Sequence, residues 1–176
     1  MSTIFLEFKP TQSRTRSDVC AWVSGVRVIK GAYRFEYHSI VMSKNDILLS
    51  SINNFYNEEK NRTTLMTILD KTSGISLRNL EWFITNYAKK NHTSYQTGDG
   101  KLFTVHCAYK SSLNGYSKQL FDPFCRSQKF GYTVPGTSHE IQTTLAQLNF
   151  IKWCIKNNII DYISNNKEKL FNKQLT

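Results

Sequence analysis

Near the start of the chain, apolar and polar residues alternate with a period of two, which predicts strands. Over residues 32–42, three aromatic residues spaced by two from Tyr33 fall on one face of such a strand. Ala21–Ile29 is also strand-like, and Lys30-Gly31 between the two runs suits a tight hairpin turn. A shorter apolar run covers residues 4–8. The pattern therefore predicts a β-rich part over residues 1–42.

After this point the apolar spacing changes to three and four residues, which indicates helices. Ser43 followed by Asp46 resembles a capping box that starts a helix through residue 55. A polar break at residues 57–61 precedes a predicted short helix over residues 63–69. Ser76 is predicted to cap a strong helix. Its apolar face consists of Leu77, Leu80, Ile84 and Tyr87.

The middle of the chain predicts a second hairpin and a further helix. Residues 93–104 read as two short strands around a Gly-rich turn. Residues 105–117 read as a helix, and residues 118–133 are predicted to form a loop. The inward face of the helix is predicted to carry Val105, Ala108, Tyr109, Leu113 and Tyr116.

The last part of the chain is predicted to be helical. After a turn at residues 134–136, Thr137 and Glu140 form a capping-box pattern that opens a long helix over residues 138–157. A final helix is predicted over residues 159–172. The fold class is therefore α+β: a β-hairpin or small sheet at the N-terminus, followed by a mainly helical part over residues 43–176. We expect the 176 residues to form one domain.

Charge adds a feature that the hydrophobic pattern does not show. The net charge is +10, and segments 1–70, 71–130 and 131–176 carry about +2, +6 and +2 of it. Such clustering favours a polyanionic partner, and the excess of Lys over Arg suits non-specific phosphate contacts better than base reading. The same middle segment is rich in aromatic residues, which can stack on bases.

The sequence therefore predicts a nucleic-acid surface in this segment. The alternative is a solvated lysine rim around an aromatic core, and no helix-turn-helix, zinc-finger, KH or RRM signature decides between them. The candidate phosphate contacts are Arg78, Lys89, Lys90, Lys101, Lys110, Lys118, Arg126 and Lys129. The candidate stacking residues are Tyr95, Tyr109, Tyr116 and Phe130.

The sequence gives weaker support for catalytic or metal-binding residues than for a nucleic-acid surface. In the loop over residues 121–126, Asp122, Cys125 and Arg126 could face a ligand, but the favoured interpretation is structural, with Phe121 and Phe124 anchoring the loop in the core. The four Cys and four His lack the paired spacing of zinc sites. We therefore expect no metal, no cofactor and no enzymatic activity. The scattered cysteines and the lack of a leader indicate a reducing intracellular setting.

Three blocks of the sequence carry a family resemblance: residues 75–90, 109–126 and 144–155. Their order resembles a small family of proteins of nucleocytoplasmic large DNA viruses, the giant viruses and their relatives. The resemblance covers roughly residues 63–163 and implies a viral protein located in the virion or in the host cytoplasm and virus factory. It carries no catalytic residues.

Together these observations predict a non-enzymatic viral protein that binds DNA or RNA through the basic, aromatic middle of the chain. The alternative is a structural protein of the virion, a minor capsid or core component that contacts acidic capsid proteins or the inner membrane. The long helix over residues 138–157 is expected to be central to the core, although an interface helix would have the same pattern.

Overall fold

The computed structural model describes residues 21–29, 32–40, 42–72, 74–98 and 100–171. The chain divides into two compact units, residues 1–43 and 44–176. The fold is α+β, as predicted. The single-domain organisation stays a prediction.

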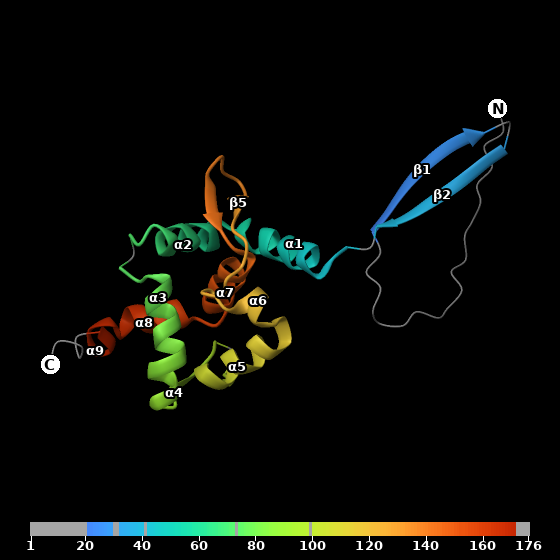
Figure 1. Ribbon diagram of the computed structural model, residues 1–176. Helices are drawn as coiled ribbons and strands as arrows, with labels where there is room; N and C mark the ends of the chain where they lie inside the picture. The colour runs from blue at the N-terminus through green and yellow to red at the C-terminus, as the bar shows by residue number, and fades with distance from the viewer. Residues whose placement is uncertain (1–20, 30–31, 41, 73, 99, 172–176) are drawn as a thin grey trace. The chain divides into compact units, whose positions relative to one another are not determined.

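The first unit contains an antiparallel hairpin. β1 (Ala21–Ile29) pairs with β2 (Ala32–Ile40), with Ala21 opposite Ile40 and Ile29 opposite Ala32 (Figure 1). The predicted turn at residues 30–31 and the apolar run at residues 4–8 lie outside the described residues.

The second unit is built around helix α7 (Leu145–Lys156), as its broad apolar surface predicts. Thr144 caps this helix, because its side-chain oxygen accepts a hydrogen bond from the Gln147 backbone N–H at 3.2 Å. Leu148, Phe150 and Ile151 are fully buried. The elements packed on α7 include α1 (Lys44–Tyr56), α2 (Glu59–Leu69), α6 (Lys118–Phe121) and α8 (Ile159–Asn165), as Figure 1 shows.

The helix predicted after Ser76 forms, but it contains a wide turn. Ser76 accepts a hydrogen bond from the Asn79 backbone N–H at 3.2 Å and begins α3 (Leu77–Trp82). The chain then continues as a π-helix, η1 (Phe83–Tyr87), and ends as α4 (Ala88–Lys90). The Ala88 N–H donates to the Phe83 carbonyl five residues back, which is the π pattern.

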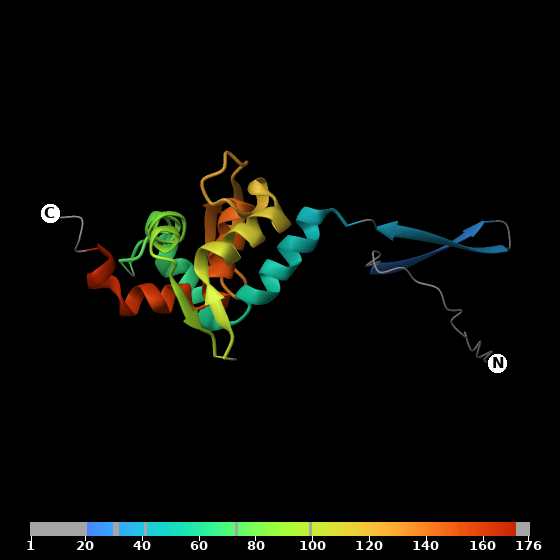
Figure 2. The ribbon, with the colours of Figure 1, turned by 90° about the horizontal axis from the view of Figure 1, so that it is seen from below.

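The predicted hairpin over residues 93–104 is confirmed. β3 (Ser94–Gln96) pairs antiparallel with β4 (Leu102–Thr104), and Gly100 closes the turn with a positive φ of 76°. The hairpin projects from the helices in Figure 2. It leads directly into α5 (Val105–Tyr116), which confirms the helix predicted there.

Two predictions for the segment after α5 are wrong. Residues 118–133 are not all loop, because they begin with α6 and end with strand β5 (Phe130–Thr133). The long helix does not start at residue 138, because β6 (Glu140–Thr143) pairs with β5 and places Tyr132 opposite Ile141. The β5–β6 hairpin buries Tyr132 and Val134 against the core, and this outweighs the local capping pattern of Thr137 and Glu140.

Two helix boundaries also differ from the prediction. Helix α2 starts at Glu59, because Asn61 is buried and its amide donates to the Phe55 carbonyl at 3.1 Å and to a Glu58 carboxylate oxygen at 3.0 Å. These polar residues therefore lie within the helix start and are not a break. The last predicted helix is two helices, α8 and α9 (Lys167–Phe171), separated at Asn166.

Candidate nucleic-acid surface

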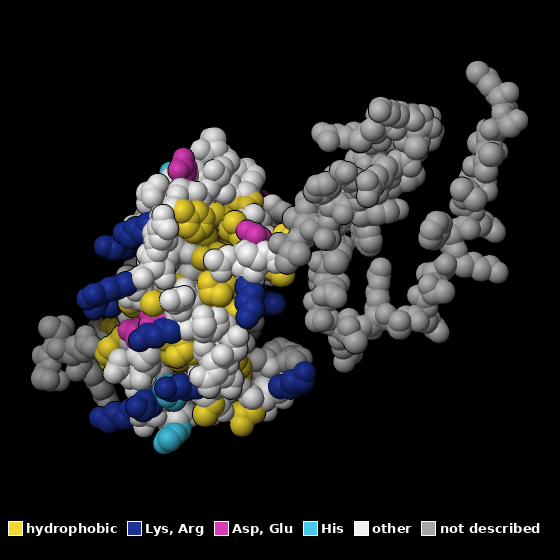
Figure 3. Space-filling model, turned by 45° about the vertical axis from the view of Figure 1, so that its right-hand side comes forward, with side chains coloured by type: hydrophobic (Ala, Val, Ile, Leu, Met, Phe, Trp, Pro, Cys, Tyr) yellow, Lys and Arg dark blue, Asp and Glu magenta, His cyan; other side chains and the backbone are white. Residues whose placement is uncertain are grey.

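All eight candidate cations are exposed side chains of the second unit. In Figure 3, Lys and Arg side chains gather along one side of the face shown, with few acidic side chains between them. Within the described part of the chain, Lys89, Lys110 and Arg126 have no acidic side chain as an ion-pair partner. Their charge is therefore open to an anion from outside.

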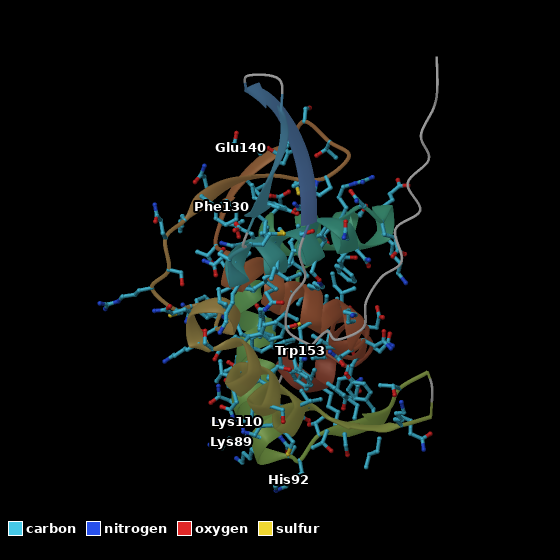
Figure 4. All side chains as sticks on the ribbon, turned by 90° about the vertical axis from the view of Figure 1, so that its right-hand side faces the viewer. Lys89, His92, Lys110, Phe130, Glu140 and Trp153 are labelled. Carbon is cyan, nitrogen blue, oxygen red and sulfur yellow. The ribbon has the colours of Figure 1, made fainter. Side chains whose placement is uncertain are left out.

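One end of this basic surface is formed where α4 meets α5. Lys89 on α4 and Lys110 on α5 lie on packed elements, and Figure 4 shows both at the same end of the molecule as His92. Helix α5 is also tied to the π-helix η1 that precedes α4, because the ring nitrogen Nδ1 of His106 lies 3.2 Å from the Ile84 carbonyl. The helical segments that carry the two lysines are therefore packed together.

The middle of the surface brings together residues distant in sequence. The Arg78 guanidinium on α3 lies 5.4 Å from the centre of the Phe124 ring, which is 47% exposed. Lys118 pairs with Asp122 at 3.8 Å on the surface, an arrangement that contributes little to stability. Both basic side chains therefore adjoin the loop after α6.

The loop over residues 121–126 is held to the core, mainly as the sequence predicted. Phe121 is fully buried, and the Asp122 carboxylate accepts a hydrogen bond from the Phe124 backbone N–H at 3.0 Å. The Gln147 side-chain amide donates to the Pro123 carbonyl at 3.2 Å. The prediction that Phe124 also anchors the loop in the core is wrong, because this ring lies at the surface under Arg78.

Tyr109 does not serve as a stacking residue in this structure. The side chain is only 6% exposed, and its ring lies 5.7 Å from Phe121 and 6.1 Å from Trp153. Burial raises the pKa of the Tyr109 phenol to about 12, with the nearby Asp122 charge adding to the effect. The inward placement predicted from the helix period is confirmed, and it removes this ring from the candidate surface.

Tyr95 is half-buried and its ring is engaged. It stacks on Tyr162 with ring centres 5.1 Å apart, and its hydroxyl donates to the Asn157 carbonyl. Burial is the main reason why the pKa of Tyr95 is raised. The ring is therefore part of the packing of β3 against α8 and the end of α7.

Tyr116 and Phe130 remain as rings with accessible surface. Tyr116 is 44% exposed and stacks on the buried Phe121, so its predicted inward placement is wrong. The helix ends at Tyr116. Phe130 is half-buried and is labelled in Figure 4 on the strand β5 side of the molecule.

A groove of about 560 Å³ adjoins Phe130, between the start of α1 and the segment from α6 to β5. Its basic residues are Arg126, which the sequence predicted, and Lys44, which it did not. No local pattern links Lys44 to Arg126, because only the tertiary packing of α1 brings them to one groove. The polar residues lining it are Asn45, Asp46, Ser117, Gln119, Ser127 and Gln128.

The described residues offer little metal chemistry. Among them, no three His, Cys, Asp or Glu side chains come together as metal ligands. Cys154 is fully buried and burial raises the pKa of its thiol, so it packs as a small apolar residue. In the described part of the chain, no helix combines the length and the apolar character needed to cross a bilayer.

Residues 34–175 match a family described as a family of unknown function, DUF7197, and the chain belongs to this family. It is also 44% identical over 107 residues to Uncharacterized protein L507 of Acanthamoeba polyphaga mimivirus. The alignment covers 57% of this chain and 41% of the relative, so the chain spans less than half the length of that protein. No solved structure matches. The predicted resemblance to an uncharacterised giant-virus family is confirmed.

Proposed function

We propose that this protein binds nucleic acid, DNA or RNA, through a basic surface formed by α4, α5 and the segment from α6 to β5. The observation that carries the proposal is the set of exposed cations on this side of the second unit, several without an acidic partner in the described residues. No residue is assigned a catalytic role.

Three properties favour a nucleic acid over a small anion. The cations belong to several elements, among them α3, α4, α5 and α6, so they suit a ligand with many phosphates. Most of them are lysines, which contact phosphates as point charges. Two accessible rings, Tyr116 and Phe130, belong to the same unit and can contact bases.

The test is a titration of labelled DNA and RNA at several salt concentrations, followed by fluorescence anisotropy. We expect affinity to fall steeply as salt rises, because each neutralised phosphate releases a counterion. Replacement of both Lys89 and Lys110 by Glu should weaken binding and reduce the slope of log K against log salt by ~0.7–0.9 for each lost phosphate contact.

The matched control replaces two exposed lysines elsewhere in the second unit, Lys60 on α2 and Lys156 at the end of α7, by Glu. Both double variants change the net charge equally, so an effect of overall charge weakens both to the same extent. A loss of affinity that is larger in the variant of Lys89 and Lys110 than in the control supports the proposed surface. The absence of binding by the wild type at low salt contradicts it.

A structural role in the virion is the second candidate function. A second groove, of about 570 Å³, is lined by Ile47 and Tyr116, which are 48% and 44% exposed. Exposed apolar side chains of this size favour a protein contact. Copurification with capsid proteins, together with no nucleic-acid binding at low salt, would support this role instead.

A further inference from the structure

We propose that the groove beside Phe130 binds an unpaired base, which makes single-stranded nucleic acid the ligand class of this protein. This inference rests on the proposed function and narrows it. The groove lies at the border of the basic surface, and Arg126 belongs to both. Its volume of about 560 Å³ is within the ~300–1,000 Å³ range of small-molecule sites.

Phe130 supplies an aromatic ring that is held from behind. Its ring meets the Tyr132 ring edge-on, with centres 6.2 Å apart and an interplanar angle of 85°. Tyr132 is itself buried, and its hydroxyl donates to the Asn53 side-chain oxygen at 2.9 Å. The part of Phe130 that lines the groove is therefore presented by a fixed support and loses little freedom when a base stacks on it.

Lys44 and Arg126 supply positive charge from the two sides of the groove. Lys44 belongs to the first turn of α1, and Arg126 belongs to the loop after α6. That loop is tied back by the Ser127 hydroxyl, which donates to the Gln119 carbonyl at 3.3 Å. The two cations suit the phosphates on either side of a bound base.

Three side-chain amides line the same groove, from Asn45, Gln119 and Gln128. An amide both donates and accepts hydrogen bonds, as the edge of a base does. Within the described residues, the side chains of Gln119 and Gln128 have no hydrogen-bond partner. The groove thus combines a ring, amides and cations, which match the face, the edge and the backbone of one nucleotide.

A base that is paired and stacked in a duplex cannot bind in this groove. In a duplex both faces of each base are covered by its neighbours, so a ring within a groove reaches a base only after it has been unstacked. Proteins that bind single strands combine a positive groove with such rings. Phosphate contacts alone do not require an unstacked base, so the ring is the feature that favours a single strand.

The experiment compares three ligands with the full chain at one salt concentration: a single strand, its duplex, and an abasic single strand with the same number of phosphates. We expect the intact single strand to bind most tightly. The Phe130→Leu variant keeps apolar volume but removes the stacking face. It should lose about fivefold or more in affinity for the intact strand and nothing for the abasic strand.

The matched control is Phe55→Leu. Phe55 is also half-buried, also meets a neighbouring tyrosine nearly edge-on, and lies outside the groove lining. Urea unfolding of both variants checks that they fold. An equal effect of both substitutions, or equal binding of the intact and abasic strands, overturns the inference and leaves the proposed function standing. Absence of binding to all three ligands overturns both.

Discussion

Replacement of Tyr109 by Ala tests whether this ring belongs to the core or to the nucleic-acid surface. The side chain is 6% exposed and packs among Phe121, Phe150 and Trp153. A buried aromatic side chain covers about 150–250 Å², which at ~25 cal/mol per Å² corresponds to about 4–6 kcal/mol. That value is an upper bound, because an unfolded chain also buries some surface. We therefore expect a loss of about 3–5 kcal/mol in the free energy of unfolding.

This loss is large compared with the ~5–15 kcal/mol stability of an ordinary domain. Tyr116→Ala provides the comparison on the same helix. Its ring is 44% exposed and stacks on Phe121 from outside, so we expect a loss of only about 1–2 kcal/mol. Tyr109→Phe keeps the ring and should remain close to the wild type.

Urea unfolding followed by tryptophan fluorescence is the assay, because Trp153 lies 6.1 Å from the Tyr109 ring and reports on its surroundings. Nucleic-acid affinity is measured in parallel under conditions in which each variant is folded. The folded Tyr109→Ala protein should bind as tightly as the wild type to within about twofold, since ~0.4 kcal/mol corresponds to such a factor. Unchanged stability with a marked loss of affinity would refute the assignment of this ring to the core.

Two further predictions concern stability alone. Burial raises the pKa of Tyr132 to about 12, above the value of ~10 in an unfolded chain, so the unfolded state releases this proton first. The contribution of Tyr132 to the free energy of unfolding is therefore intact below pH ~10 and decreases as the pH rises towards about 12. Urea unfolding across this range should show the decrease in stability. The Tyr132→Phe variant should show a shallower decrease. Thr144→Ala removes the cap of α7 and should lower the free energy of unfolding by ~1 kcal/mol, which is measured as a lower urea midpoint. Thr144→Ser should retain most of the stability.

The helix phasing predicted from the sequence was correct for the centre of each apolar face, but not for Tyr116 at the end of α5. Leu80, Ile84 and Val105 are all fully buried, as the period of the apolar residues predicts. The β5–β6 hairpin was missed although period-two signals exist, because Thr137 and Glu140 match a local capping pattern. The capping pattern can be read from the sequence, but the burial of Tyr132 and Val134 cannot, because it depends on the helices that pack beneath them.

In the candidate site, the exposure of the charged residues could be predicted from the sequence, whereas the placement of the aromatic residues could not. Charged side chains are rarely buried unpaired, so exposure of Lys89, Lys110 and Arg126 followed from residue type alone. Aromatic residues occur both in cores and at surfaces, and only the structure separates the buried Tyr109 from the accessible Phe130. The groove could not be predicted, since Lys44 reaches it from a helix distant in sequence.

The wide turn of η1 has a consequence for comparing members of this family. A turn of the π type holds one more residue than the same stretch of α-helix. A relative that keeps every residue between Phe83 and Tyr87 but forms a regular α-helix there would have each following position rotated by about 100° about the helix axis. Lys89 and Lys90 would then face a different direction from α5. A relative that lacks one residue at this point would make the same turn as a regular α-helix, so a single-residue gap here in an alignment is compatible with cations that share the same face.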